Sequence, residues 1–66
     1  NANINLLPVD NAIVKKFVPL KLFLEKKGQK ISDFDLLIAS TALVYDLTLA
    51  TRNKRHFSRI PRLQLL

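Results

Sequence analysis

This 66-residue sequence contains no cysteine, one histidine and one glycine. The lack of cysteine excludes disulfide bonds and thiolate metal sites, and a single histidine cannot build a zinc centre. A chain this short forms at most one domain, whose core alone supplies only about 3–5 kcal/mol of stability. Because neither disulfide bonds nor zinc can reinforce that core, we expect contacts with a partner to do so.

The sequence also lacks a long uncharged apolar run and a charged leader followed by an apolar core. A spanning helix needs about 20 apolar residues in succession, and a secretory signal needs a leader of that kind. We therefore predict neither a signal peptide nor a membrane span. The chain begins at Asn1 instead of methionine, so a cytoplasmic fragment of a larger domain fits best.

The apolar content, by contrast, is high. Hydrophobic residues make up 48% of the chain and the mean hydropathy is +0.11, which is far from the composition of a disordered chain. A domain this small cannot cover so many apolar side chains alone. The composition therefore predicts that a sheet face is covered by another copy, by a missing half of the domain or by a protein partner.

Charge is distributed unevenly along the chain, whose formal net charge is +6. All five acidic residues lie at or before Asp46, and residues 51–66 contain no acid. The cations of that last segment are Arg52, Lys54, Arg55, Arg59 and Arg62. Such a surface suits phosphate groups or an acidic partner, and it also suits simple solubility.

The first half of the sequence predicts a strand and a helix. Ile4–Val9 is typical of a short buried strand, and Asp10 is a suitable N-cap. An apolar, lysine-rich helical pattern follows and ends at Gly28. Pro19 interrupts it, which predicts a kink or two short helices. The lysines could also lie on an anionic membrane, but we favour a core-packing helix with a solvated face.

Ile31–Asp46 has the strongest local signals of the chain. Ser32 as N-cap with Asp35 three residues later resembles a capping box, and Ile31 with Leu36 can form a hydrophobic staple. Apolar residues then encircle the predicted helix, interrupted only by small polar ones, so we expect it to be buried on most sides. Aromatic residues in the two helices are expected in the core: Phe17, Phe23 and Tyr45.

The remaining segments are short. Leu47–Ala50 and Leu63–Leu66 are predicted strands, and Asn53 can cap a single helical turn over Lys54–Phe57. The order of strand, helices, strand and final strand favours a parallel α/β arrangement. The sequence contains no internal repeat and no glycine-rich phosphate loop.

Candidate functional residues follow the second strand and begin the second helix. Ligands bind parallel sheets at the carboxyl ends of the strands, where Thr51, Arg52 and Asn53 are expected. Asp33 and Asp35 lie about 200° apart around the helix axis, so they cannot both point into one site. Asp35 can meet Asn53 only if the first helix runs obliquely or reverses near its proline. Taken alone, each residue is more often a helix cap than a ligand, so neither identifies an enzyme.

Three segments together carry a family resemblance: DFDLLIASTA (33–42), LTLATRNKRHF (47–57) and IPRLQL (60–65). They resemble the C-terminal half of a PIN domain of the VapC type, a toxin ribonuclease. The resemblance implies a partial PIN-like, Rossmann-like parallel sheet with two main helices. It also implies that residues 1–66 are the C-terminal part of a single PIN domain whose N-terminal half is absent.

The resemblance implies a site in which acidic residues hold Mg²⁺ or Mn²⁺ and cleave RNA. Asp35 matches the acid at the start of the helix, and Asn53 stands where many PIN domains have a further acid. The family's two earlier acids have no counterpart here. Catalysis and metal binding are therefore assigned to Asp35 and Asn53, and substrate binding to Thr51, Arg52, Lys54, Arg55 and Arg59. His56 is either a packed or surface side chain or a proton-transfer group.

Two functions are weighed. The first is a fragment of a Mg²⁺-dependent endoribonuclease toxin of a type II toxin-antitoxin system, with RNA and a cognate antitoxin as partners. The fragment alone is expected to be inactive, because one carboxylate and one amide bind Mg²⁺ weakly. The alternative is a noncatalytic or degenerate PIN-derived piece that binds nucleic acid or protein. An upstream half with an aspartate after an apolar strand would distinguish the two.

Overall fold

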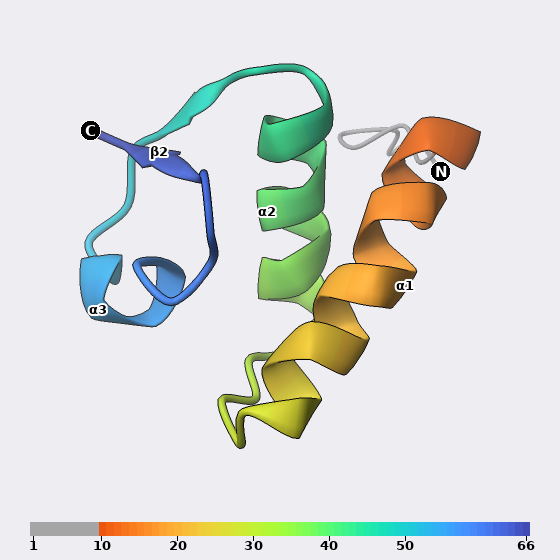
Figure 1. The fold of residues 1–66 in the computed structure, drawn as a ribbon. Coiled ribbons are helices and arrows are strands. Elements are labelled where there is room, and N and C mark those ends of the chain that lie inside the picture. The colour runs from red at the N-terminus through yellow and green to blue at the C-terminus, as the bar shows by residue number, and fades with distance from the viewer. Residues whose placement is uncertain (1–9) are drawn as a thin grey trace, which may run out of the picture.

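A computed structural model describes residues 10–66, so the predicted strand Ile4–Val9 lies outside the described residues. Figure 1 shows two long helices side by side. A small sheet and a short helix lie on the side of the second helix that faces away from the first. The elements are α1 (Asn11–Lys26), α2 (Asp33–Val44), β1 (Thr48–Leu49), α3 (Lys54–Phe57) and β2 (Gln64–Leu65). The predicted α/β class is confirmed.

Helix α1 begins and ends where the sequence predicts. The Asp10 carboxylate accepts a hydrogen bond from the Ile13 amide at 2.9 Å, as an N-cap should. Gly28 follows the helix with a φ of 68°, a conformation that glycine adopts without steric cost. Of the two outcomes predicted for Pro19, a kink or two short helices, the second is wrong, because α1 is one helix that contains this proline. That proline is exposed, so the carbonyl group deprived of a donor can be hydrated.

One stripe of α1 packs against α2. Ile13, Leu20 and Leu24 are buried, and the latter two share a core cluster with Leu36 and Ala39 of α2. This packing confirms the core-facing helix that was favoured over a membrane-surface helix. In residues 10–66, no helix has both the length and the apolar character that crossing a membrane requires.

Helix α2 is buried along much of its length, as predicted. Its two central polar side chains are satisfied internally: the Ser40 hydroxyl donates to the Leu36 carbonyl at 2.8 Å, and that of Thr41 donates to the Leu37 carbonyl at 2.9 Å. Buried hydroxyl groups with partners cost little. The expectation that Tyr45 is a core residue is wrong, because 51% of this residue is exposed.

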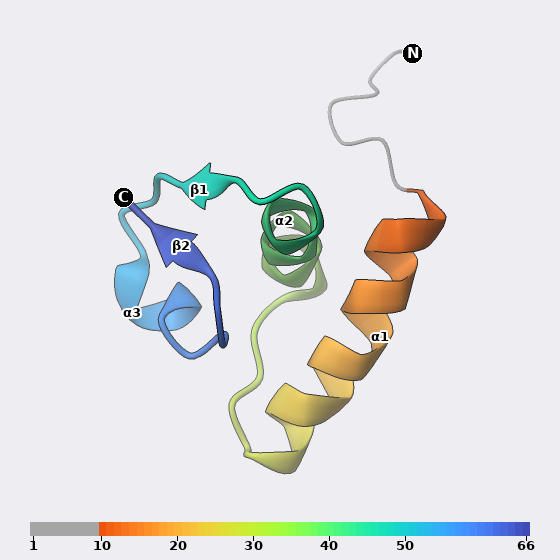
Figure 2. The same cartoon turned by 45° about the horizontal axis from the view of Figure 1, so that its top comes forward.

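The sheet is parallel, with Thr48 opposite Gln64 and Leu49 opposite Leu65. Both strands are two residues long, which is shorter than predicted. Leu49 and Leu65 pack against the core cluster, whereas Thr48 and Gln64 are exposed and joined by a side-chain hydrogen bond of 3.2 Å. The single turn of α3 lies where it was expected, and its Phe57 is buried. Figure 2 shows the two strands lying beside the end of α2.

An apolar hollow of about 500 Å³ lies between the two long helices. Its apolar lining residues are Val14, Phe17, Val18, Phe34 and Leu37, and Phe34 is 65% exposed. Part of the uncovered apolar surface that the composition predicts is therefore found on the two helices. Phe23, also expected in the core, is 37% exposed, while Phe17 packs against the core cluster.

Tyr45 joins the two helices at the end where α1 begins and α2 ends. Its hydroxyl donates a hydrogen bond to the Asp10 carboxylate, 35 positions away in the sequence. This bond is the main cause that lowers the pKa of Asp10, and it also raises the pKa of Tyr45. Both shifts stabilise the fold in the range where Asp10 is ionised and Tyr45 is protonated.

We predict that Tyr45→Phe lowers the melting temperature at neutral pH. Because the folded-state pKa of Asp10 is lowered, its contribution is complete above the unfolded-state value of about 3.9 and is lost as pH falls through the folded-state pKa. The raised pKa of Tyr45 makes its contribution disappear at high pH, above about 10. Thermal unfolding followed by circular dichroism should show the largest difference between these limits. A difference independent of pH would contradict this role.

Asp46 occupies a position that favours glycine. Its φ is 56°, and the Leu47 amide donates to the Ala42 carbonyl at 2.8 Å, which is the longer of the two hydrogen bonds of a Schellman motif. We predict that Asp46→Gly raises the free energy of unfolding by about 1 kcal/mol, because a side chain in this conformation is strained. Asp46→Ala removes the same carboxylate but keeps the Cβ atom, so urea unfolding should show no such gain. An equal gain in both variants would contradict the argument.

Candidate functional site

The N-terminus of α2 is built by the predicted cap. The Ser32 hydroxyl oxygen accepts a hydrogen bond from the Asp35 amide at 3.1 Å, and Ile31 packs against the cluster that contains Leu36. Within residues 10–66, the reciprocal bond of a capping box, from the Ser32 amide to the Asp35 carboxylate, is absent. The half-buried Asp35 carboxylate is therefore not needed as a cap.

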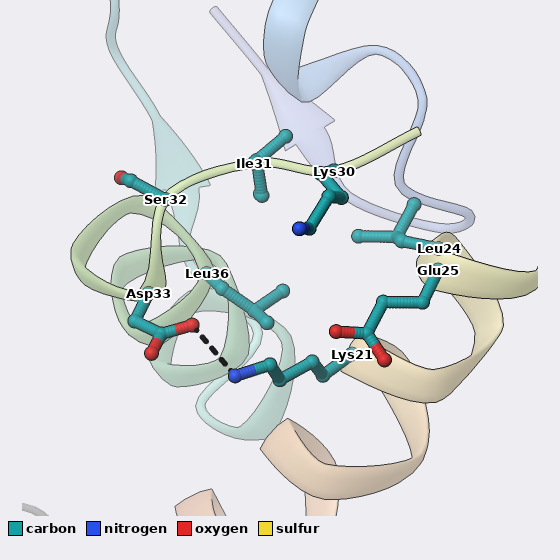
Figure 3. Close-up of a pocket in the computed structure, with 8 residues that line it drawn as sticks. All are labelled: Lys21, Leu24, Glu25, Lys30, Ile31, Ser32, Asp33 and Leu36. Atoms are coloured by element: carbon teal, nitrogen blue, oxygen red, sulfur yellow. Dashed lines mark ion pairs between the residues drawn. The ribbon is translucent and has the colours of Figure 1, made fainter. Parts of the chain in front are cut away.

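The Asp33 carboxylate, unlike that of Asp35, has a charged partner among the described residues. It forms an ion pair of 3.0 Å with the Lys21 ammonium group of α1. Figure 3 shows this pair spanning a cavity of about 330 Å³, into which Glu25 of α1 also points and which Lys30 borders. The pair is largely exposed, so it contributes little stability. The two aspartates thus have different surroundings, in agreement with their separation of about 200° around the helix axis.

Lys21 and Glu25 were not anticipated as neighbours of the α2 N-terminus. They lie on the preceding helix, and only the packing of α1 against α2 brings them to this cavity. No local motif in the sequence signals such a contact. The cavity contains both charge signs, two lysines and two acids, so it does not select an anion or a cation.

Asn53 begins α3 as predicted, but its side chain does not cap the helix. The side-chain amide nitrogen of Asn53 lies 2.9 Å from Nδ1 of His56. Because this nitrogen can only donate, the ring nitrogen is the acceptor. The backbone amide of Asn53 donates to the Thr51 hydroxyl at 3.0 Å. These contacts leave the Asn53 side-chain oxygen as the atom that could bind a cation. His56 is half-buried on the turn that ends at buried Phe57.

The start of α2, which carries Asp35, and helix α3, which follows Asn53, lie at the same end of the molecule. Figure 1 shows α3 at the level where α2 begins, and Phe57 and Ile60 share the core cluster with Leu36. Helix α1 does not reverse near its proline, but passes alongside α2 (Figure 1). In the described part of the chain, no group of three or more acids, histidines or cysteines is placed to hold a metal ion.

A divalent cation fits the donors at this end only in part. Hard cations such as Mg²⁺ prefer carboxylate and amide oxygens, the atom types that Asp35 and Asn53 offer. Six ligands are needed, and Mg²⁺ usually takes several of them from water and substrate phosphate. The cations predicted to hold substrate, Arg52, Lys54, Arg55 and Arg59, are all exposed, whereas Thr51 is half-buried.

Comparison with known proteins identifies the family. The family model described as PIN domain matches residues 1–63, so the chain belongs to the PIN domain family. Its sequence is similar to ribonuclease VapC1 of Methanocaldococcus jannaschii, with 40% identity over 52 residues, or 79% of this chain and 38% of that protein. It is also similar to ribonuclease VapC2 of Rickettsia felis, with 50% identity over 46 residues, or 70% of this chain and 34% of that protein.

Solved structures give the same result. The chain resembles VapBC2 of Rickettsia felis, crystallised with a DNA fragment from its promoter, with a TM-score of 0.81, 40% identity and coverage of 86% of this chain and 43% of that one. It resembles VapBC-1 of nontypeable Haemophilus influenzae with a TM-score of 0.84, 33% identity and coverage of 91% and 45%. The fold predicted from the resemblance is confirmed. The chain spans less than half the length of each of these relatives.

We predict that Ser32→Ala lowers the free energy of unfolding by about 1 kcal/mol, because the Asp35 amide loses its only side-chain acceptor at the start of α2. Ser32→Thr keeps an acceptor at the same position and should lie within a few tenths of a kcal/mol of the unchanged chain. Chemical unfolding measures both. Equal stability of the two variants would show that the bond does not hold the helix start.

Proposed function

We propose that this chain is the C-terminal part of a VapC-type PIN ribonuclease, which hydrolyses RNA phosphodiester bonds with Mg²⁺ or Mn²⁺. The observation that carries the proposal is the carboxylate of Asp35. It is half-buried at the N-terminus of a helix that Ser32 already caps, in a chain 50% identical to a ribonuclease over the matched segment. A carboxylate that forms no hydrogen bond or ion pair within residues 10–66 is available to bind a ligand.

The residues of this chain would divide the work as follows. Asp35 supplies a charged oxygen ligand, and Asn53 a neutral one, held in place by its bond to His56. A bound divalent ion would neutralise charge developing on the phosphate and activate water. The exposed arginines and lysine after β1 would hold substrate phosphates without reading base sequence. His56 Nδ1 accepts a hydrogen bond, so a role in proton transfer would fall to its other ring nitrogen.

Partners are part of the same proposal. The hollow lined by Val14, Val18 and Phe34 leaves apolar surface uncovered, which a folded protein normally buries against something else. We propose that the N-terminal half of the domain, a second copy or a cognate antitoxin covers it. A cytoplasmic location accords with a ribonuclease that acts on cellular RNA.

The proposal is tested in a complete domain. Residues 1–66 are grafted in place of the matching segment of Rickettsia felis VapC2, and cleavage of random-sequence RNA is measured with Mg²⁺, with Mn²⁺ and with EDTA. We expect cleavage that needs the metal, and about a 100-fold or greater loss on Asp35→Asn, since metal assistance is worth several kcal/mol. The 66-residue chain alone should not cleave.

Asp33→Asn is the matched control, because Asp33 lies two residues before Asp35 and the substitution removes the same charge. The carboxylate of Asp33 pairs with Lys21. The cleavage rate of this variant should stay within a few-fold of the unchanged graft. Calorimetric titration with Mn²⁺ gives a second readout, in which only Asp35→Asn weakens binding. A folded graft that cleaves RNA equally well with and without the Asp35 carboxylate would overturn the assignment. A folded graft that never cleaves would favour the noncatalytic alternative.

A further inference from the structure

A basic groove runs along α1 from Phe23 to Lys15 and reaches Leu43, near the end of α2. It is a cavity of about 310 Å³ between α1 and the turn before β2, rimmed by Lys15, Lys16 and Arg62, with Phe23 and Leu43 among its apolar lining. A neighbouring cavity of about 300 Å³ shares two of these cations and the leucine, and continues the surface toward Asp46 and β2. We call the two together the basic groove.

Arg62 holds an unusual backbone position. The Leu63 amide donates to the Ile60 carbonyl at 3.4 Å, Pro61 is the second residue of this turn, and Arg62 has a φ of 68°. A proline followed by a residue of positive φ is the pattern of a type II turn, in which glycine or asparagine is the usual third residue. A side chain with a Cβ atom is strained in this conformation. Strain of this kind points to a use for the side chain.

Among residues 10–66, the cations of the basic groove form no ion pair, and cations outnumber acids in it. No acidic residue lines the first cavity, and Asp46 lines only the second. In residues 10–66 the ion pair present is that of Lys21 with Asp33, on another part of the surface. Three cations on two separate elements therefore converge on one hollow and attract negative charge.

We infer that the basic groove binds single-stranded RNA through its phosphate groups. Grooves that bind single strands combine cations with an aromatic face on which a base can stack. Phe23 can provide such a face, since it is 37% exposed. The Lys27 ammonium lies over its ring, 4.9 Å from the ring centre, so a base would stack on the other face or displace the lysine. The acid-free segment 51–66 adds further positive charge to the same molecule.

The position of the groove suits a strand that continues from the candidate site. Leu43 is eight residues after Asp35 on α2, which is about 12 Å along the helix. An RNA strand of a few nucleotides can cover that length. The inference thus rests on the proposed ribonuclease function and adds to it a binding surface remote from the reacting phosphate, which positions the substrate.

Binding is measured without cleavage, so that the two proposals can fail separately. The grafted VapC2 protein is titrated in EDTA with a fluorescent 12-nucleotide single-stranded RNA, and anisotropy is recorded at several salt concentrations. Lys16→Gln and Arg62→Gly should each weaken binding about fivefold at 0.1 M salt and reduce the salt slope by about 0.7, the value for one phosphate contact on a single strand. Arg62→Gly should also melt no lower than the unchanged graft, because glycine relieves the turn.

Lys26→Gln is the charge-matched control, since Lys26 is exposed on α1 outside the basic groove. It should change affinity less than twofold. Equal losses in all three variants would indicate bulk attraction and overturn the inference, as would no loss in any. A poly-glutamate peptide is the competing arm: if it binds with the same dependence on Lys16 and Arg62 while RNA does not, the groove serves a protein partner and the inference is wrong.

Discussion

The packing of α1 against α2 is the constraint on which the rest of the structure depends. Leu20 and Leu24 of α1 meet Leu36 and Ala39 of α2 in one cluster, and burying each leucine contributes about 1.5–3 kcal/mol. Phe57 completes this cluster from α3. The same helix pair therefore fixes the start of α2, where Asp35 lies, and the segment that carries Asn53. A small chain without disulfide bonds has few other ways to hold those two side chains in order.

The two ends of α2 differ in their chemistry. Its first turn carries aspartates at the positive end of the helix dipole, which favours negative charge there. Its last turn lies beside lysines of α1 and the strained arginine before β2. The aspartates at the start of α2 can thus attract a cation, and the basic residues beside its end can attract an anionic polymer. That arrangement suits an enzyme that must grip a phosphate chain at a distance from the phosphate it attacks.

Local signals accounted for much of the fold. Asp10, Ser32 and Gly28 mark helix ends through interactions with their immediate neighbours, so they could be identified from the sequence. Pro19 misled, because whether a proline divides a helix depends on which side of it faces solvent. The prediction for Tyr45 was wrong for another reason. An aromatic residue in an apolar helix is expected in the core, but the hydroxyl of Tyr45 bonds to Asp10, which lies 35 positions away in the sequence.

The candidate site was less predictable than the fold. Asp35 and Asn53 were singled out through family resemblance, since each alone has the pattern of a helix cap. The structure adds that Asp33 pairs with Lys21, a contact that depends on helix packing and that no local spacing encodes. Among residues 10–66, no group of three or more acids, histidines or cysteines could hold a metal ion, so these residues gave no further ligand to predict.

The connections of the fold are short, and this has a consequence for the order of folding. Thr48 and Gln64 pair only 16 positions apart, and the two long helices are joined by a six-residue connection, residues 27–32. Closing short loops costs little entropy, and chains rich in such local contacts fold quickly. The helical hairpin can therefore form as soon as its own residues are available, before the parallel strands meet. A chain of this kind presents a preformed helical surface to whatever binds it next.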